Sequence, residues 1–279
     1  MPIKDIMVLC DAGEANDYRV ETVLSLAKVY EAHVTGMYLV PYPVIPVYGG
    51  AFPETIPYTA TDQLDKATNI AKKLNAKFNE KASQFEVPHE WKTIDGIDVR
   101  YVIDNARYTD IVVVPQGYSR YGEENTQKID DYLSIHLGRP LMVIPDLKKV
   151  FNLPKYVIIA WDESHEAARA VHDALPFLQY AERIQVVSVS VSPDEEKASM
   201  IYCDDLRKHL SHHGINVDVV SLDQSAKGTG GTIFQSALEY DADLIVMGAY
   251  GHSRLKEIVL GGATSYLLKH TTIPLFLSH

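Results

Sequence analysis

The sequence has few of the residues that mark secreted, membrane or nucleic-acid-binding proteins. Its two cysteines, Cys10 and Cys203, cannot supply a framework of several disulfides. Its apolar runs are no longer than a β-strand, so we expect no transmembrane helix. Basic residues are scarce, because 26 Lys and Arg face 37 Asp and Glu and leave a net charge of −11. This acidic balance argues against binding to nucleic acid or to an anionic membrane.

The shortage of positive charge extends over both halves of the chain. Residues 1–150 carry 16 basic and 21 acidic side chains, and residues 151–279 carry 10 and 16, so the halves have charges of −5 and −6. An apolar strand pattern begins within the first ten residues and leaves no room for a signal peptide, so we expect a cytoplasmic protein. A chain of 279 residues fits two domains of about 140 residues each.

The two halves contain matching segments, which indicates an internal repeat. In each half an apolar strand ends in Asp, a second apolar strand follows an Asp, and a Tyr-x3-His segment leads to Pro and a closing strand. These pairs are 6–11 with 156–162, 110–115 with 243–248, and 132–140 with 266–274. The stretch 146–154 has no periodicity of its own, so we predict domains at 1–147 and 154–279.

Strand and helix patterns alternate through each half. The predicted strands are 4–10, 33–40, 88–93, 110–115 and 140–145, then 155–161, 184–190, 216–221, 243–248 and 274–278. The predicted helices are 14–31, 61–85, 98–107 and 125–137, then 164–180, 194–213, 229–240 and 259–271. The alternation predicts two doubly wound α/β domains, each a five-stranded parallel sheet with helices on both faces. Ligands bind such sheets beyond the carboxyl ends of the strands, where the strand order changes direction.

A glycine-rich segment follows the fourth strand of the second half. Residues 247–252 read Met-Gly-Ala-Tyr-Gly-His, and residues 261–264 read Gly-Gly-Ala-Thr, which gives the spacing Gly-x2-Gly-x9-Gly. Glycines at a strand end let backbone N–H groups approach a phosphate, and a helix start adds free N–H groups and a positive dipole end. Asp162 ends the first strand of the same half, so it is expected to face the same crevice as Gly248.

This spacing resembles the nucleotide-binding signature of the universal stress protein family. The resemblance covers nearly the whole chain as a tandem of two family domains. It implies the adenine nucleotide alpha hydrolase-like fold, with the closing strands of the two halves paired as an intrachain pseudo-dimer; a homodimer of whole chains stays open. It also implies binding of ATP or AMP, with or without Mg²⁺. The implied ligand contacts are Asp162, Val189, Met247, Gly248, Gly251, His252, Arg254, Gly261, Gly262 and Thr264.

Purely structural roles compete with this assignment. Asp162 could cap the following helix, the glycines could serve turn geometry alone, and Arg254 could be a solvated surface charge. Gly262 stands where the family has Ser or Thr, so one hydroxyl contact of about 0.5–1.5 kcal/mol is missing unless Thr264 or Ser265 replaces it.

The first half departs further from the family pattern, and we predict that it is a degenerate copy. Only Asp11 remains of the site. The other positions carry Pro115 for Gly248, Tyr118 for Gly251, Gln127 for Gly261, Lys128 for Gly262 and Asp130 for Thr264. A carboxylate at Asp130 would repel phosphate. Repeated Pro and Gly exclude regular helix over 41–53, and we predict a loop at 41–58. This loop could form a partner site, cover the cleft or pack on its own domain.

Two weaker patterns have two interpretations each. The glycine-rich helix start at 227–232 could contact an anion, but a flexible loop capped by Thr229 or Thr232 is the simpler interpretation. His209, His212 and His213 have metal-ligand spacing but no accompanying ligands, so they are interpreted as favourable charges at a helix end and no metal site is assigned.

Two classes of function remain. The first is a stress-response module that binds an adenine nucleotide and signals through protein partners. The second is a scaffold of the same fold that binds no nucleotide and acts through protein contacts. No catalytic base is evident, so no catalytic residue is assigned and at most weak ATPase activity is expected.

Overall fold

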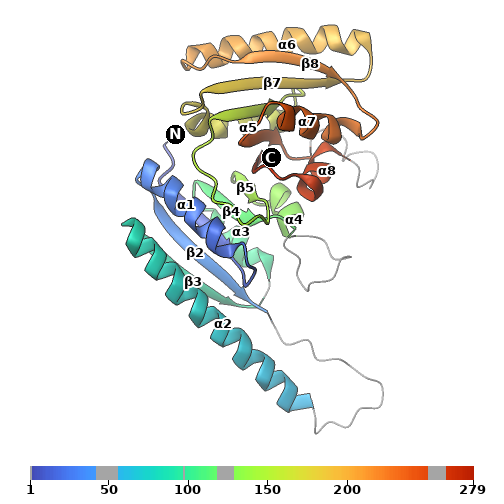
Figure 1. The fold of residues 1–279 in the computed structure, drawn as a ribbon. Coiled ribbons are helices and arrows are strands. Elements are labelled where there is room, and N and C mark those ends of the chain that lie inside the picture. Colours follow the sequence, from blue (N-terminus) through green and yellow to red (C-terminus); the bar gives the residue numbers. More distant parts are fainter. Residues whose placement is uncertain (1, 42–55, 97, 118–128, 251–261) are drawn as a thin grey trace.

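The computed structural model describes residues 2–41, 56–96, 98–117, 129–250 and 262–279. They form one layer of strands between two layers of helices (Figure 1). Within these residues, no helix combines the length and apolar character that crossing a membrane requires.

Strands and helices alternate as the sequence predicts. The first half contains β1 (Asp5–Cys10), α1 (Asn16–Tyr30), β2 (His33–Val40), α2 (Ile56–Phe85), β3 (His89–Asp95), α3 (Val99–Ala106), β4 (Ile111–Pro115), α4 (Ile129–His136) and β5 (Leu141–Ile144). The second half contains β6 (Tyr156–Ala160), α5 (His165–Leu178), β7 (Arg183–Ser190), α6 (Pro193–His212), β8 (Asp218–Asp223), α7 (Gly228–Glu239), β9 (Leu244–Gly248), α8 (Ala263–His270) and β10 (Leu275–Ser278).

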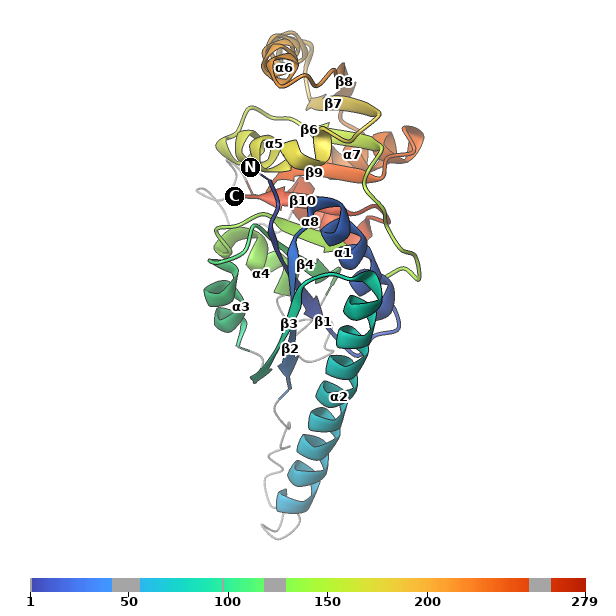
Figure 2. The same ribbon diagram turned by 90° about the vertical axis from the view of Figure 1, so that its left-hand side faces the viewer.

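The strands of both halves join in one ten-stranded sheet with the order β3-β2-β1-β4-β5-β10-β9-β6-β7-β8. All neighbours within a half are parallel, and β5 and β10 pair antiparallel, with Phe276 opposite Met142. The closing strands of the two halves therefore meet at the centre of the molecule (Figure 2). Pairing removes two exposed sheet edges, and the predicted pseudo-dimer of doubly wound halves is confirmed.

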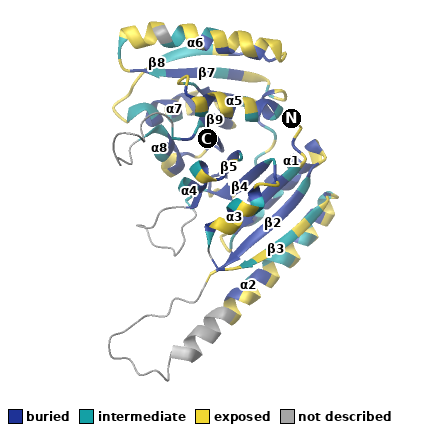
Figure 3. Ribbon diagram, turned by 180° about the vertical axis from the view of Figure 1, so that it is seen from behind, coloured by how far each residue is buried: buried dark blue, intermediate teal, exposed yellow. Residues whose placement is uncertain are grey.

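Each face of the sheet has its own apolar core. One core joins the strands to α1, α2, α5 and α6, and the other joins them to α3, α4, α7 and α8. Strands such as β4, which is buried along its whole length, have apolar side chains on both sides because both faces are covered (Figure 3).

The two halves also contain equivalent hydrogen bonds. Asp110 Oδ2 accepts hydrogen bonds from the backbone N–H groups of residues 4 and 5, at 2.7 and 3.0 Å. Asp243 Oδ2 accepts the same pair of bonds from residues 155 and 156, at 3.0 and 3.1 Å. Each Asp thus ties the start of the fourth strand of its half to the start of the first. The limits of the two domains, 1–147 and 154–279, remain predictions.

The main difference from the sequence-based expectation is the start of α2. The helix begins at Ile56, so residues 56–58 are helical and the prediction of a loop through residue 58 was wrong there. Pro57 lies in the first helical turn, where proline is tolerated because the N–H it lacks would have no partner in the helix. Residues 42–55 lie outside the part of the chain that the structure describes. Two edge strands, β3 and β8, also end two residues later than predicted, because they stay paired with β2 and β7 to those points.

Candidate functional site

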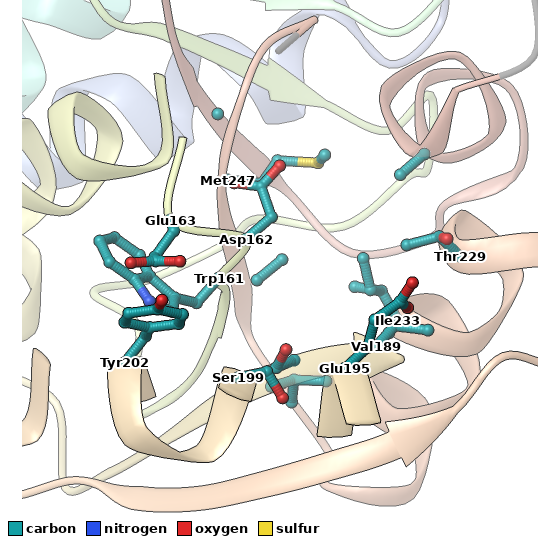
Figure 4. Close-up of a pocket in the computed structure, with 15 residues that line it drawn as sticks. Trp161, Asp162, Glu163, Val189, Glu195, Ser199, Tyr202, Thr229, Ile233 and Met247 are labelled. Carbon is teal, nitrogen blue, oxygen red and sulfur yellow. The ribbon is translucent and has the colours of Figure 1, made fainter. Parts of the chain in front are cut away.

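A cavity of about 290 Å³ lies at the carboxyl ends of β6, β7 and β9 (Figure 4). β6 has β9 on one side and β7 on the other, so the sheet order changes direction here. The first half of α6, the first turns of α7 and the first residue of α8 complete the wall. This is the place where an open α/β sheet offers a ligand site.

The strand ends give the cavity an apolar bed. Its lining includes the apolar side chains of Ala160, Val187, Val189, Ile233 and Met247. Val187 is almost wholly buried, and Met247 is 6% exposed. A bed of this kind favours a flat, largely apolar group over a strongly hydrated one.

Asp162 projects from the end of β6 and shapes the turn into α5. Its Oδ1 accepts hydrogen bonds from the backbone N–H of Ser164, at 3.1 Å, and from the Ser164 hydroxyl. Ser164 is itself the N-cap, since its Oγ accepts from the N–H of Ala167 at 3.1 Å. Asp162 therefore supports the N-cap residue Ser164 but is not itself the N-cap. Its Oδ2 makes no hydrogen bond to the described residues, which leaves a carboxylate oxygen for a ligand.

Gly248 has a structural reason to be glycine. A Cβ at this position would lie 2.5 Å from the backbone nitrogen of Ala167 and 2.6 Å from the carbonyl carbon of Glu166. The first turn of α5 thus packs directly on the end of β9, and a side chain at Gly248 would push the helix away.

The start of α8 forms a further part of the border. Gly262 is its N-cap, with φ −81° and ψ 168°, and no side chain caps the helix there. Ala263, the first helical residue, lines the cavity. Among the described residues, a Cβ built on Gly262 would meet nothing within 4 Å, so none of them crowds the N-cap position. The unpaired N–H groups and positive dipole end of such a turn favour an anion.

Thr264 has a different environment from the lining residues. Its side chain is 4% exposed, and its hydroxyl accepts a hydrogen bond from the N–H of Tyr250 at 3.3 Å. It therefore fastens the residues after β9 to the first turn of α8.

The structure brings together part of the predicted site. Four of the predicted residues line the cavity: Asp162, Val189, Met247 and Gly248. Gly262 and Thr264 lie next to it without lining it. Four more fall outside the residues that the structure describes: Gly251, His252, Arg254 and Gly261.

Several lining residues carry no sequence motif that would have revealed them. Figure 4 shows Trp161, Glu163 and Tyr202 gathered at one side of the cavity, away from Thr229 and Ile233. The indole N–H of Trp161 is buried and has no hydrogen-bond partner among the described residues. Tyr202 comes from α6, and only the packing of that helix over β7 brings it here, which explains why strand-end reasoning missed it.

The described lining is acidic. Asp162, Glu163 and Glu195 contribute carboxylates, and none of the described lining residues is Lys or Arg. Glu163 has φ +63°, a left-handed conformation that is uncommon for a residue with a side chain. Glu195 has a local partner, since its Oε2 accepts from the N–H of Val191 at 3.0 Å at the start of α6. An anion bound here would need help from helix N–H groups or from a metal cation.

The glycine-rich segment 227–232 is the first turn of α7, not a flexible loop. Neither Thr229 nor Thr232 caps the helix, because its N-cap is Lys227 and no side chain bonds there, so the capping prediction was wrong. Gly230 is needed for packing instead, since a Cβ on it would lie 2.7 Å from Cβ of Tyr266 on α8. The segment keeps α7 and α8 close together.

In the first half, the carboxylate that corresponds to Asp162 already has a partner within the chain. Asp11 forms an ion pair with Arg19, whose side chain is 1% exposed. Arg19 also donates to the carbonyl of Leu9 at 3.3 Å and to Oδ1 of Asn16 at 3.2 Å. The carboxylate that remains from the site in this half therefore serves an internal network.

Comparisons with known proteins agree with the fold. The family model described as the universal stress protein family matches residues 155–279. A universal stress protein from Archaeoglobus fulgidus is 16% identical, with 98% of this chain and 95% of that chain covered and a TM-score of 0.73. A putative universal stress protein from Pseudomonas aeruginosa is 13% identical, with 99% and 93% covered and a TM-score of 0.58. A functionally unknown protein from the same species is 11% identical, with 99% of this chain and 92% of that chain covered and a TM-score of 0.59.

At these identities the solved structures establish the fold of the whole chain and nothing finer. No curated protein sequence is similar enough to match. Residues 155–279 therefore match the universal stress protein family, and the whole chain has the fold of the universal stress protein from Archaeoglobus fulgidus.

Proposed function

We propose that the second half binds an adenine nucleotide, ATP or AMP, in the cavity at the ends of β6, β7 and β9. The protein then acts as a stress-response binding and signalling module and not as an efficient enzyme. The observation that carries this proposal is the position of the cavity. It lies where the sheet order changes direction, with Asp162 on one border and the first turn of α8 on the other.

The described residues suit the parts of a nucleotide in turn. The apolar bed, with Val189 and Met247, accepts a purine base. The Oδ2 of Asp162 accepts hydrogen bonds from ribose hydroxyls or a base amino group. The free N–H groups at the start of α8 receive phosphate oxygens, and no described residue crowds Gly262.

The acidic lining argues for Mg²⁺ as a companion of ATP. Three carboxylates and no cationic side chain line the described cavity, so an unshielded triphosphate would be repelled. Magnesium is usually held by phosphates and water with few protein ligands, which suits this site. We expect Mg²⁺ to strengthen binding of ATP more than binding of AMP.

Two further parts of the proposal concern the location and the assembly of the protein. We propose action in the cytoplasm, because the chain is acidic and its two cysteines are buried and unpaired. The closing strands already pair inside the chain, so any homodimer would have to use another surface. Signalling would then work through protein partners that distinguish the bound from the free form.

Isothermal titration with ATP, AMP and adenosine, each with and without Mg²⁺, tests the proposal. Asp162→Asn keeps the oxygen that accepts from Ser164 but replaces the other acceptor by an NH2 donor, so the turn should persist while affinity falls about tenfold. Asp104→Asn changes an exposed carboxylate on α3 and serves as the matched control. If wild-type protein binds none of the three at millimolar concentration, the nucleotide proposal fails. The scaffold function then takes its place.

A further inference from the structure

Two helices begin beside the cavity and contact the first half of the chain with their carboxyl ends. They are α5, which begins after Asp162, and α8, which begins after Gly262. At the far end of α8, Nε2 of Gln116 donates hydrogen bonds to the carbonyl oxygens of Leu268 and Thr271, at 2.9 and 3.1 Å. Gln116 belongs to the first half and directly follows β4.

The far end of α5 has a similar contact. The Tyr30 hydroxyl, at the end of α1, donates to the carbonyl oxygen of Pro176 at 3.1 Å. Its ring also meets Phe177 and Tyr180 edge to face, with centroids 5.7 and 5.8 Å apart. Burial raises the pKa of Tyr30, so the hydroxyl stays protonated and remains a donor.

These contacts fall on groups that a helix cannot satisfy alone. The last carbonyl groups of an α-helix have no intrahelical partner, so a fixed external donor determines where that end lies. α8 has only eight residues and is about 12 Å long. A helix this short moves as one body, so a contact at its carboxyl end also sets the position of Ala263 at the cavity.

The contact between Gln116 and α8 is one-sided. Gln116 and Ala249 occupy equivalent positions, because their N–H groups donate to Ile144 and Ser278, the last residues of the two closing strands, at 2.9 and 2.8 Å. Alanine has no side chain that could reach α4 in return. The half without the glycine loop therefore holds a helix of the half that has it, and the described residues make no reverse contact of this kind.

We propose that the first half is a positioning partner for the nucleotide site, acting through Gln116 on α8 and through Tyr30 on α5. We refer to these two contacts as the helix clamp. Gln116 sets the phosphate-binding end of α8 and so determines how strongly phosphates add to affinity. Tyr30 sets the start of α5, next to Asp162, where the nucleoside is bound. The affinity part of this inference rests on the proposed function.

Gln116→Met tests the first contact, because methionine is similar in length but cannot donate a hydrogen bond. ATP should bind about threefold more weakly, while adenosine affinity stays unchanged. Gln235→Met is the matched control, since Gln235 lies on α7 and its one hydrogen bond to the described residues goes to Glu239 of its own helix. A general loss of stability would weaken both ligands together, so the difference between ATP and adenosine separates positioning from a structural effect.

Tyr30→Phe tests the second contact by removing only the hydroxyl. Adenosine and ATP should weaken together, by about two- to threefold, because α5 borders the nucleoside part of the site. Tyr108→Phe, at an 83% exposed tyrosine of the first half, is the control. Equal affinities for Tyr30→Phe and wild-type protein would remove Tyr30 from the clamp.

Hydrogen exchange of the ligand-free protein keeps the test independent of nucleotide. Gln116→Met should speed exchange of amides in α8, such as Thr271 N–H, which donates to Leu267 at 2.9 Å. If wild-type protein binds no nucleotide, the proposed function fails while faster exchange still supports the clamp. Unchanged exchange in Gln116→Met overturns the clamp. In Gln116→Met, a loss of adenosine affinity as large as the loss of ATP affinity also overturns the clamp.

Discussion

Thr264 accepts a hydrogen bond from the backbone N–H of Tyr250 through its hydroxyl oxygen, at 3.3 Å. The first half has the same link in another chemical form, since Asp130 Oδ2 accepts from the N–H of Gly117 at 2.7 Å. Both bonds join the residues after the fourth strand to the fourth helix of the half. The link persists in the half that has lost its glycine loop, so its main role is to stabilise the fold. A direct contact of Thr264 with nucleotide remains a prediction.

Thr264→Val should lower the free energy of unfolding by about 1 kcal/mol, because valine keeps the shape but leaves the N–H of Tyr250 without its acceptor. Urea denaturation measures the change. Ser265→Ala is the control, since the Ser265 hydroxyl makes no hydrogen bond among the described residues and its removal should be nearly neutral. Equal stability of Thr264→Val and wild-type protein would show that the link contributes nothing.

Gly262→Ser should fold normally and bind ATP more tightly. The position has φ −81° and an added Cβ meets no described residue within 4 Å, so serine fits among them without strain. Its hydroxyl would lie near the outer phosphates and add about 0.5–1.5 kcal/mol to ATP binding but little to AMP binding. Gly262→Ala adds the Cβ without the hydroxyl and is the control in the same titration. A gain for AMP as large as for ATP would contradict the assigned position of the phosphates.

The fold could be predicted almost completely, because its signals are local and repeated. Buried strands such as β4 are apolar throughout, and the matching segments in the two halves show that the unit occurs twice. The pairing of β5 with β10 was implied by the family resemblance, and it covers two edges that would otherwise be exposed. The start of α2 was missed because residues up to 58 were interpreted as a loop, whereas proline is tolerated in the first turn of a helix.

The site could be predicted only where a strand end marks it. Asp162 and Gly248 follow strands, so topology alone places them together. Tyr202 enters the cavity from the middle of α6, and the packing angle of a helix is not written in its own sequence. The helix clamp was missed for the same reason, since Gln116 and Leu268 are 152 positions apart and no motif connects them.

Gly248→Ala should destabilise the protein even without ligand. The added Cβ would lie 2.5 Å from the backbone nitrogen of Ala167, so α5 must shift, at a cost of about 1–3 kcal/mol. Gly138→Ala is a useful contrast: its Cβ would meet nothing within 4 Å, but φ is +65°, so only backbone strain acts there. The thermal unfolding temperatures of both variants compare the effect of a steric clash with the effect of backbone strain. A stable Gly248→Ala protein that lost only nucleotide binding would instead point to a role limited to the ligand.

Cys10 should make the protein less stable in alkali. Burial raises the pKa of its thiol from 9.0 to about 12, and the nearby Arg19 opposes only part of this shift. The folded chain then keeps a proton that the unfolded chain releases above pH 9, so stability from this group is complete below pH 9 and declines between pH 9 and about 12. Cys10→Ala should reduce the decline of unfolding free energy between pH 8 and 10.5. Identical slopes for the variant and wild-type protein would contradict this.

The two equivalent carboxylates, Asp11 and Asp162, should differ in what their loss affects. Asp11 is paired with the buried Arg19, so Arg19→Met leaves a carboxylate without its cation and should lower the free energy of unfolding by about 3 kcal/mol. The double variant Arg19→Met with Asp11→Asn removes both charges and should recover part of that loss. Neither variant should change nucleotide affinity by more than about twofold, because the site lies in the other half. A loss below about 1 kcal/mol in Arg19→Met would show that the ion pair does not hold the first half together.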